Sequence, residues 1–311
     1  VATVFFDVSY QSIVPSLVRA ERIPDANGKL ESIAQLAGIA GPAAGGWLVA
    51  AITAPFAILA TVATYVISLI ALLLTRDREV VPERHEHEPL GRSIAEGLRW
   101  VFGNRYLRRI VPTTAVSNFF GTIMYTLLPI LLFRELGFTP ELVGLVFGLS
   151  ALGGFLGAVS TPWIVRWIGE ARAIPVGSLA FTLIGFAIPA AAAVPDVAFP
   201  LLVVQGFLMS FSVLLYNITQ VSFRQRITPT RLLGRMNASI RFCVWGVMPI
   251  AALLAGALGT WIGTVPTMWI GAIGSLLSIL PVVIGPFWSM RELPSPDETE
   301  PARGALPGDS A

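Results

Sequence analysis

The sequence predicts an all-α membrane protein, a polytopic bundle of transmembrane helices. Hydrophobic residues make up 54% of the 311 positions and charged residues only 13%, whereas a soluble globular protein carries about 25% charged residues. The charged residues also cluster in short gaps between apolar stretches. The stretches without Asp, Glu, Lys or Arg are 32–75, 110–133, 142–165, 173–195, 197–223 and 242–290. A membrane β-barrel would instead alternate apolar and polar residues in strands of about ten.

These stretches, together with an apolar start, predict nine membrane spans, because a spanning helix needs about 20 mostly apolar residues. Two stretches are long enough for two spans each, and turn residues divide them at 53–55 and 263–266. In chain order the expected spans are 1–18, 33–53, 55–75, 110–133, 142–165, 173–194, 198–221, 237–262 and 266–288.

Positively charged residues predict which ends of these spans are cytoplasmic, since Lys and Arg are retained on that side. One alternating set of gaps holds nearly all of them, and the other set holds only Arg134. We therefore expect an integral protein of the plasma membrane with a cytoplasmic C-terminus. Because the number of spans is odd and the chain is already apolar at Val1, we also expect it to lack an N-terminal part.

The longest charged gap divides the chain into two halves. We expect 1–75 to be the remainder of an N-terminal bundle, 76–109 a cytoplasmic linker, 110–290 a six-helix C-terminal bundle, and 291–311 a disordered cytoplasmic tail. Five apolar residues in the linker share one helical face, which predicts an amphipathic helix at the membrane surface. These residues are Leu90, Ile94, Leu98, Val101 and Phe102.

A weak internal repeat relates 10–45 to 219–252. Each copy has a polar helix end, a basic turn, a helix start led by Asn, and a Pro within the next span, as expected of a transporter built from two similar bundles. Several motifs accompany it: FFDVSYQS at 5–12, NFFG at 118–121, YNITQ at 216–220 with Arg224 and Gln225, LLGRMNA at 232–238, and a degenerate Gly/Arg loop within 157–172. In these motifs the chain resembles the major facilitator superfamily, and within it the branch of enterobactin exporter-like and macrolide efflux-like proteins.

The resemblance implies a helix bundle of major facilitator type, in which about nine of twelve helices, the fourth to the twelfth, are present. It implies secondary active transport by alternating access, without a cofactor. We expect a proton-coupled exporter of amphipathic small molecules, of drug or siderophore type, acting as a monomer in the lipid bilayer. The alternatives are an importer or facilitator of the same fold, and a membrane sensor or scaffold that transports nothing.

Polar residues inside two of the spans are candidates to line a substrate path. They are Asn118 and Tyr125 on one span, and Tyr216, Asn217 and Gln220 on another. The resemblance supports this role, because in the family the seventh and tenth helices face the cavity. From the residues alone, hydrogen bonding between helices would explain them about as well.

Asp7 is the candidate for coupling transport to protons, because an ionisable group within a span is costly and often functional. It shares a helical face with Tyr10 and Gln11, at spacings of three and four residues. A hydrogen bond or salt bridge that fixes the bundle geometry is the alternative interpretation.

Two further groups of residues are candidates for gates or helix interfaces. Asn237 is expected to cap the start of the span 237–262, and Arg241, one turn inside it, to extend to the cytoplasmic surface; a gate role for Asn237 and an ion pair between the halves for Arg241 are the alternatives. The glycines of the second group have the spacing that lets helices approach closely. They are Gly41, Gly45, Gly153 and Gly157.

Other chemistries find little support in the sequence. The chain has one cysteine, Cys243, so that neither an internal disulfide nor a paired thiolate site can form. The alternation of His85 and His87 with Glu in a charged loop is more typical of a solvated segment than of a metal site. No nucleotide-binding or hydrolase motif occurs. We therefore do not expect an enzyme. The sequence pI of about 9.0 comes from the basic loops, so we do not expect a nucleic-acid-binding protein either.

Overall fold

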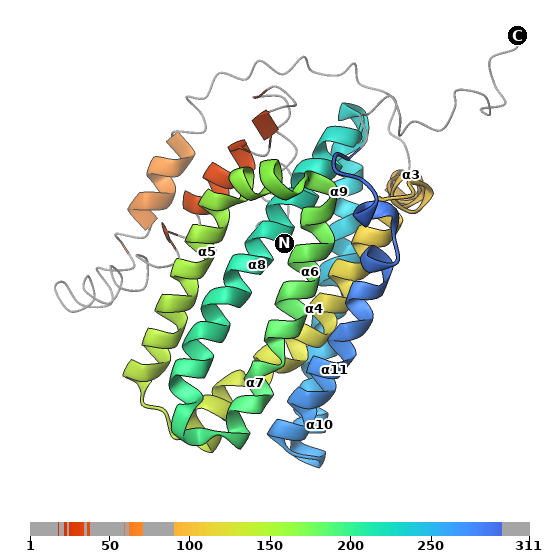
Figure 1. Cartoon of the computed structure of the whole chain (residues 1–311). Helices are drawn as coiled ribbons and strands as arrows, with labels where there is room; N and C mark the ends of the chain where they lie inside the picture. The colour runs from red at the N-terminus through yellow and green to blue at the C-terminus, as the bar shows by residue number, and fades with distance from the viewer. Residues whose placement is uncertain are drawn as a thin grey trace, which may run out of the picture.

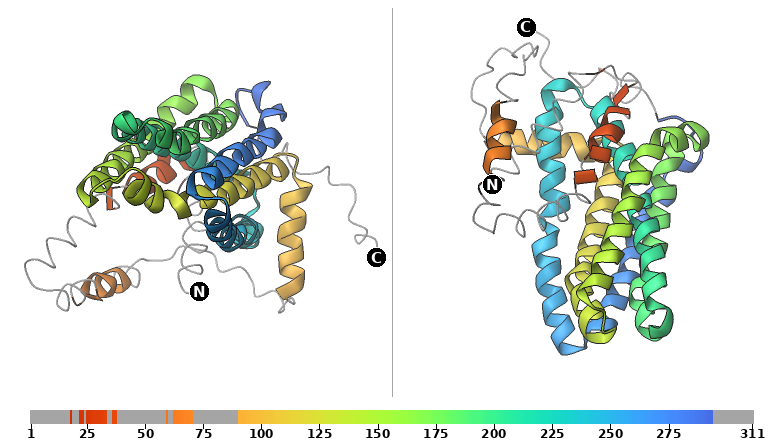
Figure 2. Two further views of the ribbon diagram at one scale, coloured as in Figure 1. Left: turned by 90° about the horizontal axis from the view of Figure 1, so that it is seen from below. Right: turned by 90° about the vertical axis from the view of Figure 1, so that its left-hand side faces the viewer.

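The computed structural model describes residues 18, 22–23, 25–33, 36–37, 59, 62–70 and 90–293. From residue 90 onward it consists of long helices that run side by side, with α3 (Leu90–Gly103) lying across one end of them (Figures 1 and 2). The long helices are α4 (Leu107–Ile130), α5 (Pro140–Ile168), α6 (Glu170–Gly185), α8 (Ala198–Ile227), α9 (Thr230–Trp245), α10 (Val247–Trp261) and α11 (Thr264–Val283). The short α7 (Ala187–Ala190) follows α6 at the opposite end from α3.

Six helical segments among the described residues are long and apolar enough to cross a membrane. Several include short extensions of the long helices, such as the π-helical turn Leu131–Glu135 after α4, and α9 and α10 count as one segment. The segments are Leu107–Glu135, Pro140–Ile168, Glu170–Ala193, Pro195–Ile227, Leu232–Trp261 and Thr264–Val283. The described part of the chain contains no β-strand. This confirms the predicted all-α membrane bundle.

The outer surface of the bundle is apolar. Trp261 is 80% exposed and Leu253 is 77% exposed, although both are large hydrophobic side chains. Such a surface would be unfavourable in water but is stable against lipid, where the helices already satisfy their own backbone groups. The chain is therefore an integral membrane protein.

Several helix boundaries differ from the expected ones by a few residues, and at two of them a side-chain contact accompanies the difference. Helix α4 begins at Leu107 rather than at 110, because the Asn104 side chain accepts hydrogen bonds from the backbone N–H groups of Tyr106 and Leu107 at 2.9 and 3.1 Å. Helix α9 begins at Thr230, seven residues before Asn237, and an ion pair between Arg235 and Glu96 of α3 lies on its first turns. The prediction that Asn237 caps a helix start is therefore wrong: Asn237 is buried inside α9.

Helices α5 and α8 pack closely because α5 presents glycines to the α8 backbone. A methyl group on Gly157 would lie 2.7 Å from the carbonyl oxygen of Phe211, and one on Gly153 would collide with the backbone of Phe207. Both glycines are buried. This arrangement is the close approach expected from the spacing of the two glycines.

The helical residues 25–33 lie against the α3 end of α8 (Figure 1). The Asn27 side-chain amide donates hydrogen bonds to Ser222 Oγ at 3.0 Å and to Gln225 Oε1 at 2.8 Å. The two partners lie almost 200 positions further along the chain than Asn27. Side-chain hydrogen bonds thus join the two halves of the sequence at this end.

Two large clusters of buried apolar side chains, and a small third one between α5 and α8, hold the long helices together. The α3-end core includes Leu107, Phe223 and Phe287. The α7-end core includes Leu131 and Leu202. Between these two cores, one face of residues 114–126 of α4 borders a cavity.

Candidate functional site

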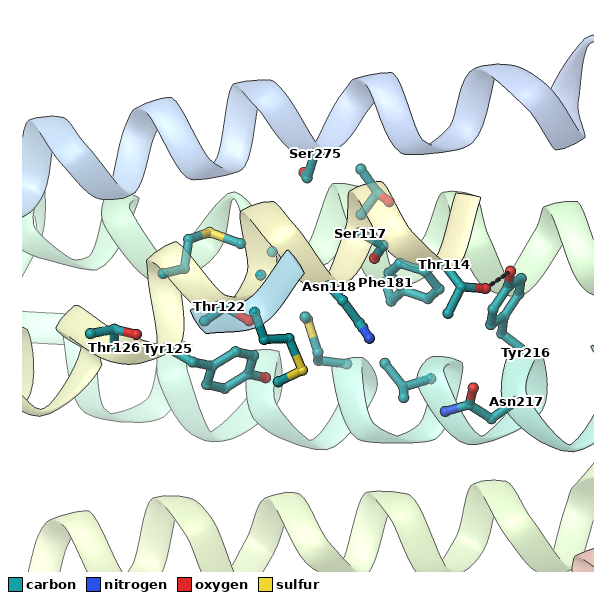
Figure 3. A pocket seen from close by; sticks show the side chains of 17 residues that line it. Thr114, Ser117, Asn118, Thr122, Tyr125, Thr126, Phe181, Tyr216, Asn217 and Ser275 are labelled. Atoms are coloured by element: carbon teal, nitrogen blue, oxygen red, sulfur yellow. Dashed lines mark hydrogen bonds between the residues drawn. The ribbon is translucent and has the colours of Figure 1, made fainter. Parts of the chain in front are cut away.

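A cavity of about 510 Å³ lies between the two cores, with walls from α4, α6, α8, α10 and α11 (Figure 3). Its volume falls within the range of about 300–1,000 Å³ that is usual for small-molecule sites. The polar residues of its wall are Thr114, Ser117, Asn118, Thr122, Tyr125, Thr126, Thr182, Tyr216, Asn217 and Ser275. Met124, Phe181, Met209, Val213 and Met248 supply most of the apolar wall.

Helix α4 contributes a continuous stripe of polar side chains to the cavity. Residues 114, 117, 118, 121, 122, 125 and 126 line it and recur every three or four positions, which places them on one helical face. Of this stripe, only Asn118 and Tyr125 were predicted from the sequence to line a substrate path. Thr114, Ser117, Thr122 and Thr126 were missed, although their helical spacing with Asn118 and Tyr125 was a usable signal.

Tyr216 forms the part of the cavity wall that lies nearest to α3. Its hydroxyl group is hydrogen-bonded to Thr114 Oγ1 at 2.8 Å and lies 3.4 Å from the backbone oxygen of Ile110. The Phe181 ring meets the Tyr216 ring edge to face, with centroids 5.5 Å apart. These contacts connect α4, α6 and α8 and close the cavity toward α3.

Asn118 joins the cavity to the bend between α9 and α10. Its Nδ2 atom donates a hydrogen bond to the backbone oxygen of Val244 at 3.3 Å, two residues before Gly246, where α9 ends. Met248, two residues beyond Gly246, lines the same cavity. The amide of Asn118 therefore contacts both the cavity and the helix bend.

Asn217 and Gln220 have different surroundings although both lie on α8. Asn217 lines the cavity opposite Asn118 (Figure 3). Gln220 is buried one turn closer to α3, outside the cavity wall, and its amide lies within 3.5 Å of both Asn217 Oδ1 and Arg224 Nη1. The structure thus brings four of the five candidate path residues to one cavity, namely Asn118, Tyr125, Tyr216 and Asn217.

The described wall of the cavity carries no Asp, Glu, Lys, Arg or His. Its polar groups are hydroxyls and amides, which can donate and accept hydrogen bonds but offer no net charge. The methionines add flexible apolar surface that adapts to ligands of different shape. Such a wall suits an uncharged amphipathic molecule.

The candidates for coupling, gating and metal binding lie outside this cavity or outside the described residues. Arg241 is half-buried, and its guanidinium group lies over the Trp245 ring, 4.6 Å from the centroid. Asp7, Gly41, Gly45 and the His85 to Glu88 segment lie outside the described residues. Within the described ranges, no three His, Cys, Asp or Glu side chains are grouped as a metal site would require.

Comparison with known proteins agrees with a membrane protein built from long helices. Residues 1–248 match the family model of the Major Facilitator Superfamily. The multidrug efflux pump Tap of Mycobacterium tuberculosis is 29% identical over 241 residues, which cover 75% of this chain and 54% of Tap, and Tap of Mycobacterium bovis matches equally. The chain thus spans about half the length of these curated relatives.

The structural comparison agrees with the family match. The crystal structure of a bacterial homologue of the iron transporter ferroportin, in an outward-facing state, superposes with a TM-score of 0.71. The sequences are 19% identical, and the match covers 92% of this chain and 69% of the homologue. At this identity the likeness concerns the fold alone.

Proposed function

Because this chain belongs to the Major Facilitator Superfamily, we propose that it is a secondary transporter that exports neutral amphipathic small molecules. The observation that carries the proposal is the cavity of about 510 Å³, with hydroxyl, amide and apolar groups but no charged group in its described wall. Similarity to a multidrug efflux pump supports export of varied molecules rather than of a single nutrient.

In this proposal the four cavity residues Asn118, Tyr125, Tyr216 and Asn217 contact the substrate. Their hydroxyl and amide groups replace hydrogen bonds that the substrate loses when it leaves water. Gln220 has a supporting role, because it lies outside the cavity wall beside Asn217. Gly153 and Gly157 let α5 and α8 pack closely, so that the C-terminal helices can move as one unit during alternating access.

Protons are the proposed coupling ion. The described cavity wall has no acidic side chain, so that a proton carrier must come from elsewhere in the chain. Asp7 is the candidate, since an ionisable residue within an apolar segment is costly unless it has a function.

The α3 end of the bundle is the proposed cytoplasmic end, in the plasma membrane. Arg105 is exposed between α3 and α4, Arg108 is exposed on the first turn of α4, and Arg226 lies at the same end of α8. Arginine is retained preferentially on the cytoplasmic side. The C-terminal residues after α11 would then also be cytoplasmic.

Flux in inverted membrane vesicles tests the proposal. The probe is tritiated chloramphenicol, a neutral molecule that carries an amide and two hydroxyl groups on an aromatic frame. An exporter that exchanges substrate for protons should accumulate the probe when the vesicle interior is acidic, and collapse of the gradient should release it. Equilibration without accumulation would indicate a facilitator, accumulation only in vesicles of the opposite orientation an importer, and binding without flux a sensor or scaffold.

A further inference from the structure

A second cavity lies beyond the first one, toward α7. It has a volume of about 260 Å³, and its walls come from α4, the turn after α4, α5, α7 and α8. Along α8 the two cavities follow one another, because residues 209–217 line the first and residues 202–210 the second. Tyr125 lines both cavities, and its side chain is 48% exposed. Tyr125 therefore separates two neighbouring spaces between α4 and α8.

Gln205 gives the second cavity a buried polar group. The residue lines this cavity and is only 7% exposed. Its side-chain amide has no hydrogen-bond partner among the residues that the structure describes. Buried amides are nearly always hydrogen-bonded, because desolvation without a partner is unfavourable. An unpartnered amide at a cavity wall is thus available to a bound molecule.

The rest of the wall restricts the chemistry of that molecule. Leu128, Val146, Phe147 and Leu202 make most of the surface apolar. Ser150 donates its hydroxyl hydrogen to the backbone oxygen of Val146 at 2.6 Å, so only its oxygen is left to accept a hydrogen bond, and the Ser210 hydroxyl also lines the cavity. No charged residue lines the second cavity within the described part of the chain. A neutral hydrogen-bonding group on an apolar body fits this wall, whereas an ion would lose its hydration without compensation.

From these observations we infer that the second cavity is a ligand subsite, in which the Gln205 amide binds a carbonyl, amide or hydroxyl group of a neutral amphipathic molecule. The inference rests on the proposed transport function and adds a second position for the substrate, on the α7 side of Tyr125. A substrate that leaves the first cavity toward the α7 end passes Tyr125. Its hydrogen bonds to the hydroxyl groups of the first cavity are then replaced by a hydrogen bond to Gln205.

Equilibrium binding of tritiated chloramphenicol to the purified chain in lipid nanodiscs tests the subsite. Gln205→Leu keeps the size of the side chain but removes its amide, and should weaken binding about ten-fold, the effect of one hydrogen bond. Ala151→Phe places a ring in the second cavity and should weaken binding at least as much. Leu152→Phe is the matched control, because Leu152 is the next residue of α5, faces outward and lines neither cavity; its affinity should equal that of the unmodified chain.

Thermal unfolding distinguishes a ligand-binding amide from a structural one. If the Gln205 amide bonds only to a ligand, Gln205→Leu should unfold at the same or a higher temperature while it binds the probe less tightly. A lower unfolding temperature with unchanged affinity would assign Gln205 to packing and overturn the subsite. Unchanged affinity in Ala151→Phe would also overturn it, and so would failure of the unmodified chain to bind the neutral probe.

The outcome for the subsite is separate from that for transport. Binding that depends on Gln205 in a chain without flux would support the subsite and reject the proposed function. Flux by a chain whose probe affinity is unaffected by Gln205→Leu and Ala151→Phe would support the function and reject the subsite.

Discussion

The hydroxyl groups of Tyr216 and Thr114 lie 2.8 Å apart, so that a side-chain hydrogen bond joins α8 to α4 at the α3 end of the cavity. Tyr216 is almost fully buried there, against the ring of Phe181. Because water cannot replace a hydrogen bond at such a position, the pair contributes both to stability and to closure of the cavity.

Tyr216→Phe should therefore lower the free energy of unfolding by about 0.5–1.5 kcal/mol, the usual range for one intramolecular hydrogen bond. Chemical denaturation in detergent, followed by circular dichroism, measures the change. Tyr125→Phe is the matched control, because the Tyr125 hydroxyl has no hydrogen-bond partner in the described part of the structure, and its stability should not change. Equal stability of both variants and the unmodified chain would show that the bond to Thr114 contributes nothing.

Gly157→Ala should destabilise the bundle, because the new methyl group would lie 2.7 Å from the Phe211 carbonyl oxygen and would push α5 away from α8. Overpacking of this kind costs about 1–3 kcal/mol. Gly148→Ala is the control on the same helix: a methyl group there meets no atom within 4 Å, and alanine favours the helix by about 0.5–1 kcal/mol. Thermal unfolding of both variants measures the difference, and a Gly157→Ala variant as stable as Gly148→Ala would contradict close packing.

The six membrane spans from residue 107 onward could be predicted from the sequence because they depend on length and charge alone; the three spans expected before residue 76 lie largely outside the described residues. A helix in lipid must satisfy its backbone internally, so a long charge-free stretch leaves little choice. The start of α9 could not be predicted in this way. Arg231 and Arg235 made residues 230–236 resemble a loop, but in the structure Arg235 pairs with Glu96 of α3, a contact between distant parts of the chain.

The candidate path residues could be predicted in part. Asn118, Tyr125, Tyr216 and Asn217 stand out as large polar side chains in apolar helices, and all four line the cavity. Hydroxyl residues are harder to assign, because a buried Thr or Ser can bond to the carbonyl four residues earlier, as Thr114 does to Ile110 at 3.0 Å. Gln220 is only three residues from Asn217, and the sequence does not show that the cavity ends between them.

Asn217→Leu should change ligand affinity and Gln220→Leu should change stability, because only Asn217 lines the cavity. Asn217→Leu should weaken binding of tritiated chloramphenicol about three- to ten-fold with little change in unfolding temperature. Gln220→Leu removes a partner of buried Arg224 and should lower the unfolding temperature with little change in affinity. Binding and unfolding measured on the same preparations test both statements; a loss of stability without loss of affinity in Asn217→Leu would assign Asn217 to packing.

Asp7→Asn should abolish transport driven by a pH gradient but preserve binding and substrate exchange, because a proton carrier must change its protonation state during the cycle. If Asp7 only forms a structural hydrogen bond, Asn can partly replace it and driven transport should survive. Driven accumulation and exchange of tritiated chloramphenicol, measured side by side in vesicles, distinguish these cases. Normal driven transport by the Asn variant would exclude Asp7 from coupling.

The central claim, that substrate passes through the cavity between α4 and α8, can be tested by blocking this cavity chemically. The single native cysteine permits a cysteine-free Cys243→Ser background. In that background Ser117→Cys places a thiol in the cavity wall, and Arg108→Cys places one on the exposed surface near α3 as the control.

The measurement is the flux of tritiated chloramphenicol before and after complete modification with N-ethylmaleimide. Modified Ser117→Cys should lose transport, and the probe should slow the modification, because both occupy the same space. Modified Arg108→Cys should transport as before. Undiminished flux through fully modified Ser117→Cys would contradict the claim that the substrate passes through this cavity.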